Sequence, residues 1–128
     1  MKLKGIDILN LSEVFSFLSS KEMGLNTAVT IVNNIKALST SKEIIDNKRN
    51  KLISEYALKE NGEIATNSDG SIKGFSDKTA FESALNKLLF EDVDIENLKP
   101  VFMNALSDIA ISPQMIAVLM QFDLLKEE

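Results

Sequence analysis

The chain has 128 residues, of which 14 are basic and 19 acidic, and its formal net charge is −5. This length predicts a single domain over residues 1–128 that buries a core without a metal or a disulfide. The sequence contains no cysteine and no histidine, which excludes thiol nucleophiles, disulfides, thiolate and imidazole metal sites, and the commonest general base.

The acidic balance disfavours duplex nucleic acid and anionic membrane surfaces as partners. The first residues reach Asp7 before any apolar run of signal-peptide length, and no stretch approaches the roughly 20 apolar residues that span a bilayer. We therefore expect a cytoplasmic protein that binds other proteins.

The first predicted element is a short amphipathic helix that begins at Asn10 and ends at Gly24. Asn10 suits an N-cap, and Glu13 follows three residues later, as in a capping box. One face of this helix is apolar and consists of Leu11, Val14, Phe15 and Leu18.

A long helix is predicted from Thr27 to Tyr56, capped by Asn26, because the segment has no proline or glycine and keeps an unbroken heptad rhythm. Two charged residues, Lys42 and Arg49, occupy seam positions where a simple hydrophobic contact would place apolar ones. The seam consists of Ile31, Ile35, Leu38, Lys42, Ile45, Arg49, Leu52 and Tyr56.

The length of this helix is its most informative property. About 30 residues give about 45 Å, whereas a compact sphere of this chain length is about 36 Å across. Three explanations remain open: an elongated molecule, a kink near Ser39–Ser41, or a seam partly covered by another chain. The half that carries the charges is where we expect a partner, and its candidate interface is Lys42, Ile45, Arg49, Leu52 and Tyr56.

Two short alternating runs around Asp69 and Gly70 predict a small β-hairpin, which needs a helix or a third strand beside it. A third helix follows, capped by Ser76 or Asp77. Its apolar stripe has the helical spacing i, i+3, i+4, i+7, i+8, with Phe81, Ala84, Leu85, Leu88 and Leu89.

The acidic run from Glu91 to Glu96 alternates acids with aliphatic residues, which predicts an edge strand. A further strand is predicted at Ile109–Ile111. Ser112 and Pro113 then predict the cap and first position of a terminal helix. Its methionines and aliphatic residues, at 115–125, form either the protein's own core or an adaptable partner groove.

The order of these parts resembles a family of small proteins encoded by phages and prophages of Gram-positive bacteria. The resemblance covers most of the chain and comprises the opening Lys-Leu helix, the long helix with Asn34 and Arg49, the Gly and Asp hairpin, and the Ile-Ser-Pro helix start at 111–113. It implies a biological context and a fold rather than an activity, and places the protein in the bacterial cytoplasm or on the virion.

Each candidate site has a simpler structural interpretation. Lys42 and Arg49 set the pairing of a facing helix, or their stems cover apolar surface while their charges stay in water. The acidic residues 91–96 and the turn 67–70 offer carboxylates to a hard cation, but the spacing does not fit a calcium loop. A solvated strand edge and an ordinary hairpin turn explain both segments, so no metal and no cofactor is expected.

The sequence thus predicts an α+β domain that is mainly helical, with four helices, one of them about 30 residues long, and a small antiparallel sheet built on a β-hairpin. The expected function is that of a non-catalytic structural or assembly protein that acts through protein contacts and self-associates through its long helix. The alternative is an inhibitor or sequestering module that binds a host protein or a small ligand. No pair of carboxylate or lysine groups is placed together by the sequence pattern, so an enzyme is not expected.

Overall fold

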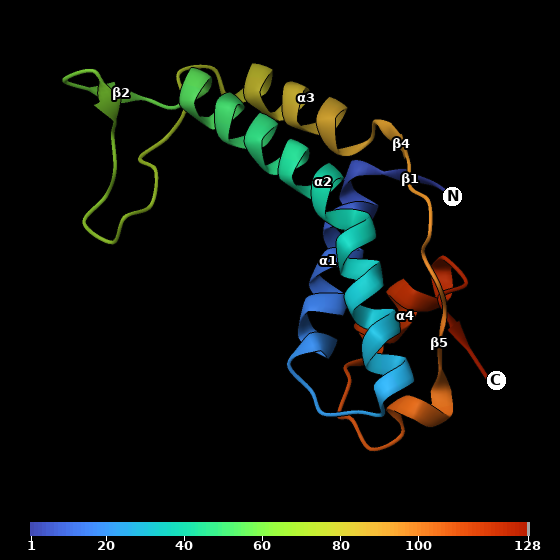
Figure 1. Ribbon diagram of the computed structural model, residues 1–128. Helices are drawn as coiled ribbons and strands as arrows, with labels where there is room; N and C mark the ends of the chain where they lie inside the picture. The colour runs from blue at the N-terminus through green and yellow to red at the C-terminus, as the bar shows by residue number, and fades with distance from the viewer. Residues whose placement is uncertain (128) are drawn as a thin grey trace. The chain divides into compact units, whose positions relative to one another are not determined.

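The computed structural model describes residues 1–127, in which two compact units are distinguished. Unit 1 consists of Met1–Lys42 and the chain from Asp92 onward, and unit 2 is Glu43–Glu91. The described residues contain four α-helices, one of them much longer than the others, and short paired strands (Figure 1). The predicted class, α+β and mainly helical, is confirmed. A single domain over residues 1–128 stays a prediction.

The long helix α2 covers Leu25–Tyr56, a length of 32 residues. It starts two residues before the predicted Thr27, and Asn26 lies inside it and not at its cap. Helical structure continues through Ser39–Ser41 without interruption. Three apolar seam residues, Ile31, Leu38 and Ile45, are buried to 96% or more, since their exposed fractions are 1, 1 and 4%. The heptad rhythm therefore reflects contacts within the chain.

The other elements of unit 1 come from both ends of the sequence. Helix α1 packs against α4, and four short strands and one 3₁₀ helix (η1) complete the unit. The bounds are β1 Lys2–Lys4, α1 Gly5–Ser19, β4 Asp92–Asp94, β5 Val101–Phe102, η1 Met103–Leu106, α4 Pro113–Gln121 and β6 Leu125–Lys126.

The predicted start of the first helix at Asn10 is wrong, because α1 begins at Gly5 and Asn10 lies in its second turn. The Asp7 carboxylate accepts a hydrogen bond of 2.9 Å from the Lys4 backbone N–H and so secures the helix start. Upstream of it, Leu3 is buried in strand β1. The capping side chain thus lies inside the first turn and not ahead of it.

The acidic run forms a strand, as predicted. Strand β4 pairs antiparallel with β1, with Leu3 opposite Val93, and not with the hairpin. The strand predicted at Ile109–Ile111 is wrong, since that segment has no strand structure. Instead, β5 pairs in parallel with β6.

Asn34 is the largest polar side chain in the core of unit 1. It is fully buried, and its amide donates to the Lys99 carbonyl at 2.8 Å and accepts from the Lys99 N–H at 2.9 Å. Pro100 follows and has no N–H, so this segment cannot continue an ordinary strand ladder. The Asn34 amide satisfies the Lys99 backbone as a paired strand would, and it holds the chain that leads into β5.

Helix α4 begins as predicted. The Ser112 hydroxyl accepts from the Met115 N–H at 3.3 Å, and Pro113 is at the first helical position. Leu119 is fully buried, whereas its neighbour Met120 is 58% exposed. The buried face of α4 therefore belongs to the protein's own core.

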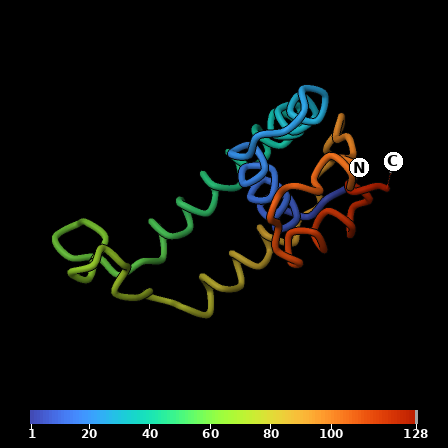
Figure 2. The backbone as a smooth tube through the Cα atoms, turned by 90° about the horizontal axis from the view of Figure 1, so that it is seen from below, coloured from blue at the N-terminus to red at the C-terminus, as the bar shows by residue number. Residues whose placement is uncertain are grey.

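In unit 2, a polar segment joins the end of α2 to helix α3, Lys78–Leu89 (Figure 2). Strands β2, Lys59–Glu60, and β3, Glu63–Ile64, form an antiparallel hairpin. Its turn is Asn61–Gly62, where both residues have positive φ angles of 53° and 81°. The predicted turn at Asp69–Gly70 exists, but it closes only an isolated bridge between Thr66 and Ile72.

Three aromatic rings anchor α3 in unit 2. Phe81 stacks on Phe75 with 4.1 Å between ring centroids and meets Tyr56 edge-on at 6.3 Å. The Asp77 side chain caps α3 by accepting a hydrogen bond of 3.0 Å from the Ala80 N–H. Of the two predicted caps, Ser76 and Asp77, the structure thus selects Asp77. These contacts fix α3 beside the second half of α2.

Candidate functional site

The predicted interface residues do not form one exposed surface. Lys42 is exposed and lies at the end of the first segment of unit 1. Ile45 is only 4% exposed, so its side chain is covered by the chain itself. The Arg49 guanidinium lies 3.0 Å from the Asp46 carboxylate one turn earlier on the same helix. Arg49 thus has a partner within the chain, as a charge on the helix surface often does.

The last two predicted interface residues contribute to unit 2 in different ways. Tyr56 is half-buried, with its ring against Phe81. Its carbonyl accepts from the Ser76 backbone N–H and hydroxyl at 2.8 and 3.1 Å, so its backbone ties α2 to the segment before α3. Leu52 lies in a groove between α2 and α3. Leu52 is therefore the predicted interface residue at which an apolar surface stays accessible beside a second helix.

This α2–α3 groove has a volume of about 250 Å³ and an apolar floor. The floor is formed by Leu52 of α2 and by Ala84 and Leu88 of α3. Leu88 is 9% exposed and Leu52 and Ala84 are half-buried, so the floor is continuous with the core of unit 2.

The rim of the α2–α3 groove is charged. Lys48 and Lys51 of α2 and Lys87 of α3 line it, together with the carboxylates of Glu55 and Glu91. All five side chains are exposed. Within residues 1–127, none of these five side chains has a hydrogen bond or an ion pair, so the charges are available to another molecule.

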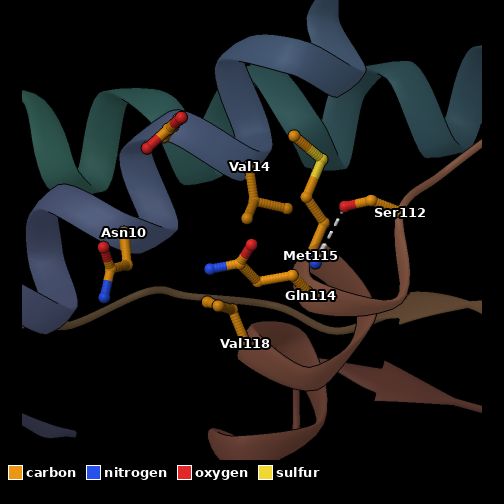
Figure 3. Close-up of a pocket in the computed structure, with 7 residues that line it drawn as sticks. Asn10, Val14, Ser112, Gln114, Met115 and Val118 are labelled. Carbon is orange, nitrogen blue, oxygen red and sulfur yellow. Dashed lines mark hydrogen bonds between the residues drawn. The ribbon is translucent and has the colours of Figure 1, made fainter.

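A second cleft, of about 140 Å³, lies between α1 and α4 in unit 1 (Figure 3). Gln114 of α4 extends toward Val14 of α1, and Met115 lies beside the Ser112 cap (Figure 3). Glu13 is the charged residue of its lining. The cleft thus places one carboxylate among amide, hydroxyl and apolar side chains.

The carboxylates of the acidic strand β4 lie beside the lysine-bearing strand β1. Among residues 1–127, no group of three or more carboxylates is arranged to hold a metal ion. Asp92 lies 3.6 Å from the Lys4 ammonium across the β1–β4 pair. The acidic run therefore forms an exposed strand edge in which Lys4 pairs with one of the carboxylates, Asp92.

The second turn of the hairpin segment is organised by Asp69. Its carboxylate accepts from the Ser71 hydroxyl at 2.6 Å and from the Ser71 N–H at 3.0 Å. These hydrogen bonds, that from the hydroxyl first, lower the pKa of Asp69 below its ordinary value. The turn is thus held by hydrogen bonds to the Asp69 carboxylate.

Changing Ser71 to Ala should raise the pKa of Asp69 toward that of an unperturbed aspartate, because the largest cause of its depression is lost. Since the folded-state pKa is depressed, the turn contributes stability above the unfolded pKa, and this contribution is lost as the pH falls through the folded value. Carbon-detected NMR titration of the Asp69 carboxyl measures the shift. Ser68→Ala in the same turn is the control, and an equal effect of both changes would contradict the assignment.

Within the part of the chain that the structure describes, no helix is both long and apolar enough to cross a membrane. Comparisons with protein-family models, curated proteins and solved structures find no match to this chain. The functional proposal therefore rests on the residues of the chain itself.

Sequence reasoning missed the lysines that surround Leu52. The stripe of α3 and the buried seam residues Ile31, Leu38 and Ile45 of α2 are confirmed, but no sequence signal states which lysine of one helix faces the other. The spacing of Lys48, Leu52 and Glu55 on one helix is the signal available, since residues three and four apart share a face.

Proposed function

We propose that this protein is a non-catalytic binding protein that works through contacts with other proteins and self-associates through its long helix. An assembly role in a phage or prophage, in the host cytoplasm or on the virion, fits the family resemblance described above. The proposal is supported by an exposed apolar stripe on the first half of α2, defined here as Leu25, Val29 and Val32.

The stripe repeats the spacing of the buried seam on the other side of the helix. Its residues follow at intervals of four and three, and they are 78, 48 and 47% exposed. At about 100° per residue, the stripe lies about 140° around α2 from the buried Ile31 and Leu38. A helix with apolar rows on opposite sides covers one row with its own chain and leaves the other for a second helix.

Uncharged apolar rows suit an interface between identical chains, because a two-fold contact places each surface against itself. Like charges at its centre would repel, and the stripe has none. The stripe has only three residues, so the contact area is small and we expect a weak dimer that forms at high protein concentration.

Replacing Val29 with Lys should abolish this self-association, because a desolvated ammonium would lie at the centre of the interface. Sedimentation velocity over a concentration series measures the effect. We expect the wild-type chain to shift from monomer to dimer with concentration and the V29K variant to stay monomeric.

Ser68→Lys is the control, since it adds the same charge in the exposed turn of unit 2. A wild-type chain that remains monomeric at every concentration would overturn the proposal of self-association. A V29K variant that dimerises as well as the S68K variant would overturn the assignment to the stripe.

The alternative function, an inhibitor or sequestering module, is favoured by a different observation: the charged rim of the α2–α3 groove. A stoichiometric complex with one host protein, formed by both V29K and wild type, would support it over self-association.

A further inference from the structure

The α2–α3 groove differs from the stripe in the kind of occupant that it fits. Its apolar floor, Leu52, Ala84 and Leu88, runs between two helices, and its volume is about 250 Å³. Pockets for drug-sized molecules have about 300–1,000 Å³ and enclose most of the ligand. A space of this size between exposed helices instead suits one or two apolar side chains of a partner that lies across the surface.

The charges of the rim select among such partners. Lysines stand on both sides of the floor, Lys48 and Lys51 on α2 and Lys87 on α3, and they outnumber the carboxylates of Glu55 and Glu91. This local excess of positive charge occurs in a chain of net charge −5. Lysine stems at such a rim can extend the apolar wall and keep their ammonium groups in water, where a bound helix would present its flanks.

A second copy of the chain is a poor occupant of this groove. Across a two-fold axis at Leu52, Lys51 would lie close to the Lys51 of the other copy at the centre of the contact, while Glu55 would lie near Lys48 at its edge. Opposed like charges disfavour such a contact. An acidic partner places carboxylates against all three lysines.

We propose that the α2–α3 groove is a docking site for an acidic amphipathic helix of another protein. The helix would insert apolar residues spaced by three or four positions against Leu52 and Leu88, and its Asp or Glu residues would flank them opposite Lys48, Lys51 and Lys87. This inference does not depend on self-association through the Leu25 stripe, which lies in the other unit.

The test is a selection from a displayed library of random peptides of about 16 residues, a length at which an amphipathic helix begins to be stable. The monomeric V29K variant serves as bait, so that self-association does not contribute. Selected peptides should be net negative, with apolar residues at helical spacing. The best peptide is then titrated by fluorescence anisotropy against the bait and its rim variants.

Combining Lys51→Glu with Lys87→Glu should weaken the selected peptide by about tenfold or more, because it reverses two opposed charges. The matched control is Lys59→Glu, an exposed lysine of β2 that does not line the groove. It should change the affinity by less than about twofold. Binding should also weaken as salt rises from about 0.05 to about 0.5 M.

Three outcomes would overturn the proposal. Selected peptides could show no acidic bias, or the Lys51 and Lys87 reversal could act no more strongly than Lys59→Glu. In the third, decanoate could shift the amide NMR signals of Leu52 and Leu88 while no peptide does so, which would make the groove a site for a small amphipathic anion. The far-UV circular dichroism spectrum of each lysine variant is compared with that of the bait. An unchanged spectrum establishes that a loss of binding comes from the altered groove and not from unfolding.

Discussion

Replacing Asn34 with Asp should destabilise unit 1 by about 3 kcal/mol or more at neutral pH, because a carboxylate would be buried against the Lys99 carbonyl oxygen. The native amide satisfies both backbone groups of Lys99, at 2.8 and 2.9 Å. An ionised Asp retains only the hydrogen bond from the Lys99 N–H. Urea denaturation followed by circular dichroism measures the loss.

The effect of Asn34→Asp should depend on pH in a defined direction. Protonated Asp can donate to the Lys99 carbonyl as the amide does, so burial and that carbonyl raise the folded-state pKa above the unfolded value of about 3.9. The variant should therefore be most stable below the unfolded pKa and lose stability as the pH rises through the folded one.

Asn33→Asp is the matched control, because Asn33 is the exposed neighbour on the same helix. Its change should stay within about 0.5 kcal/mol. An Asn34→Asp variant as stable as this control at neutral pH would contradict the role given to the amide.

Replacing Leu119 with Ala should cost about 2–5 kcal/mol, since Leu119 is fully buried and its removal leaves a cavity in the core of unit 1. The adjacent Met120→Ala should cost less than about 0.5 kcal/mol, because Met120 is 58% exposed. Thermal and urea unfolding of the two variants provides the comparison.

Equal costs for these neighbours would show that α4 is not fixed by its own core. That result would revive the interpretation of residues 115–125 as a free partner groove. The burial of Leu124 and Leu125 beside Leu119 argues for a large difference.

Two of the predicted helix starts are confirmed by a hydrogen bond from the backbone to the capping side chain. Asp77 and Ser112 cap their helices by bonds to the backbone N–H three positions on. The start of α1 was misplaced because its signal is Asp7, which binds the backbone of Lys4, and because Asn10 offered a competing cap.

Strand pairing was harder to predict because the strands contain only two or three residues each. Val101 and Leu125 are partners in the parallel pair, although 24 residues separate them, and no alternation pattern fits in two positions. The hairpin segment contained two turn signals, and the pair forms at Asn61–Gly62. The spacing of Ile31, Leu38 and Ile45 correctly indicates that one face of α2 is covered. The spacing does not say whether the chain itself or a partner covers that face.

The candidate site was only partly predictable. Leu52 was singled out from its seam position, and Leu88 from the stripe of α3, but the groove needs both at once. Lys87 belongs to its rim because α3 lies beside α2, where the aromatic contacts of Phe81 with Tyr56 and Phe75 hold it.

Unit 1 is built from two separate stretches of the sequence, which has a consequence for protein synthesis. Unit 2 is a continuous stretch, Glu43–Glu91, whereas α4, which packs against α1, lies beyond Asp92. A ribosome that adds about 5–20 residues per second needs several seconds after completing α1 before α4 emerges. During that interval α1, whose Ile8, Phe15 and Leu18 are fully buried in the folded chain, lacks its partner α4, and exposed apolar residues favour aggregation and chaperone binding.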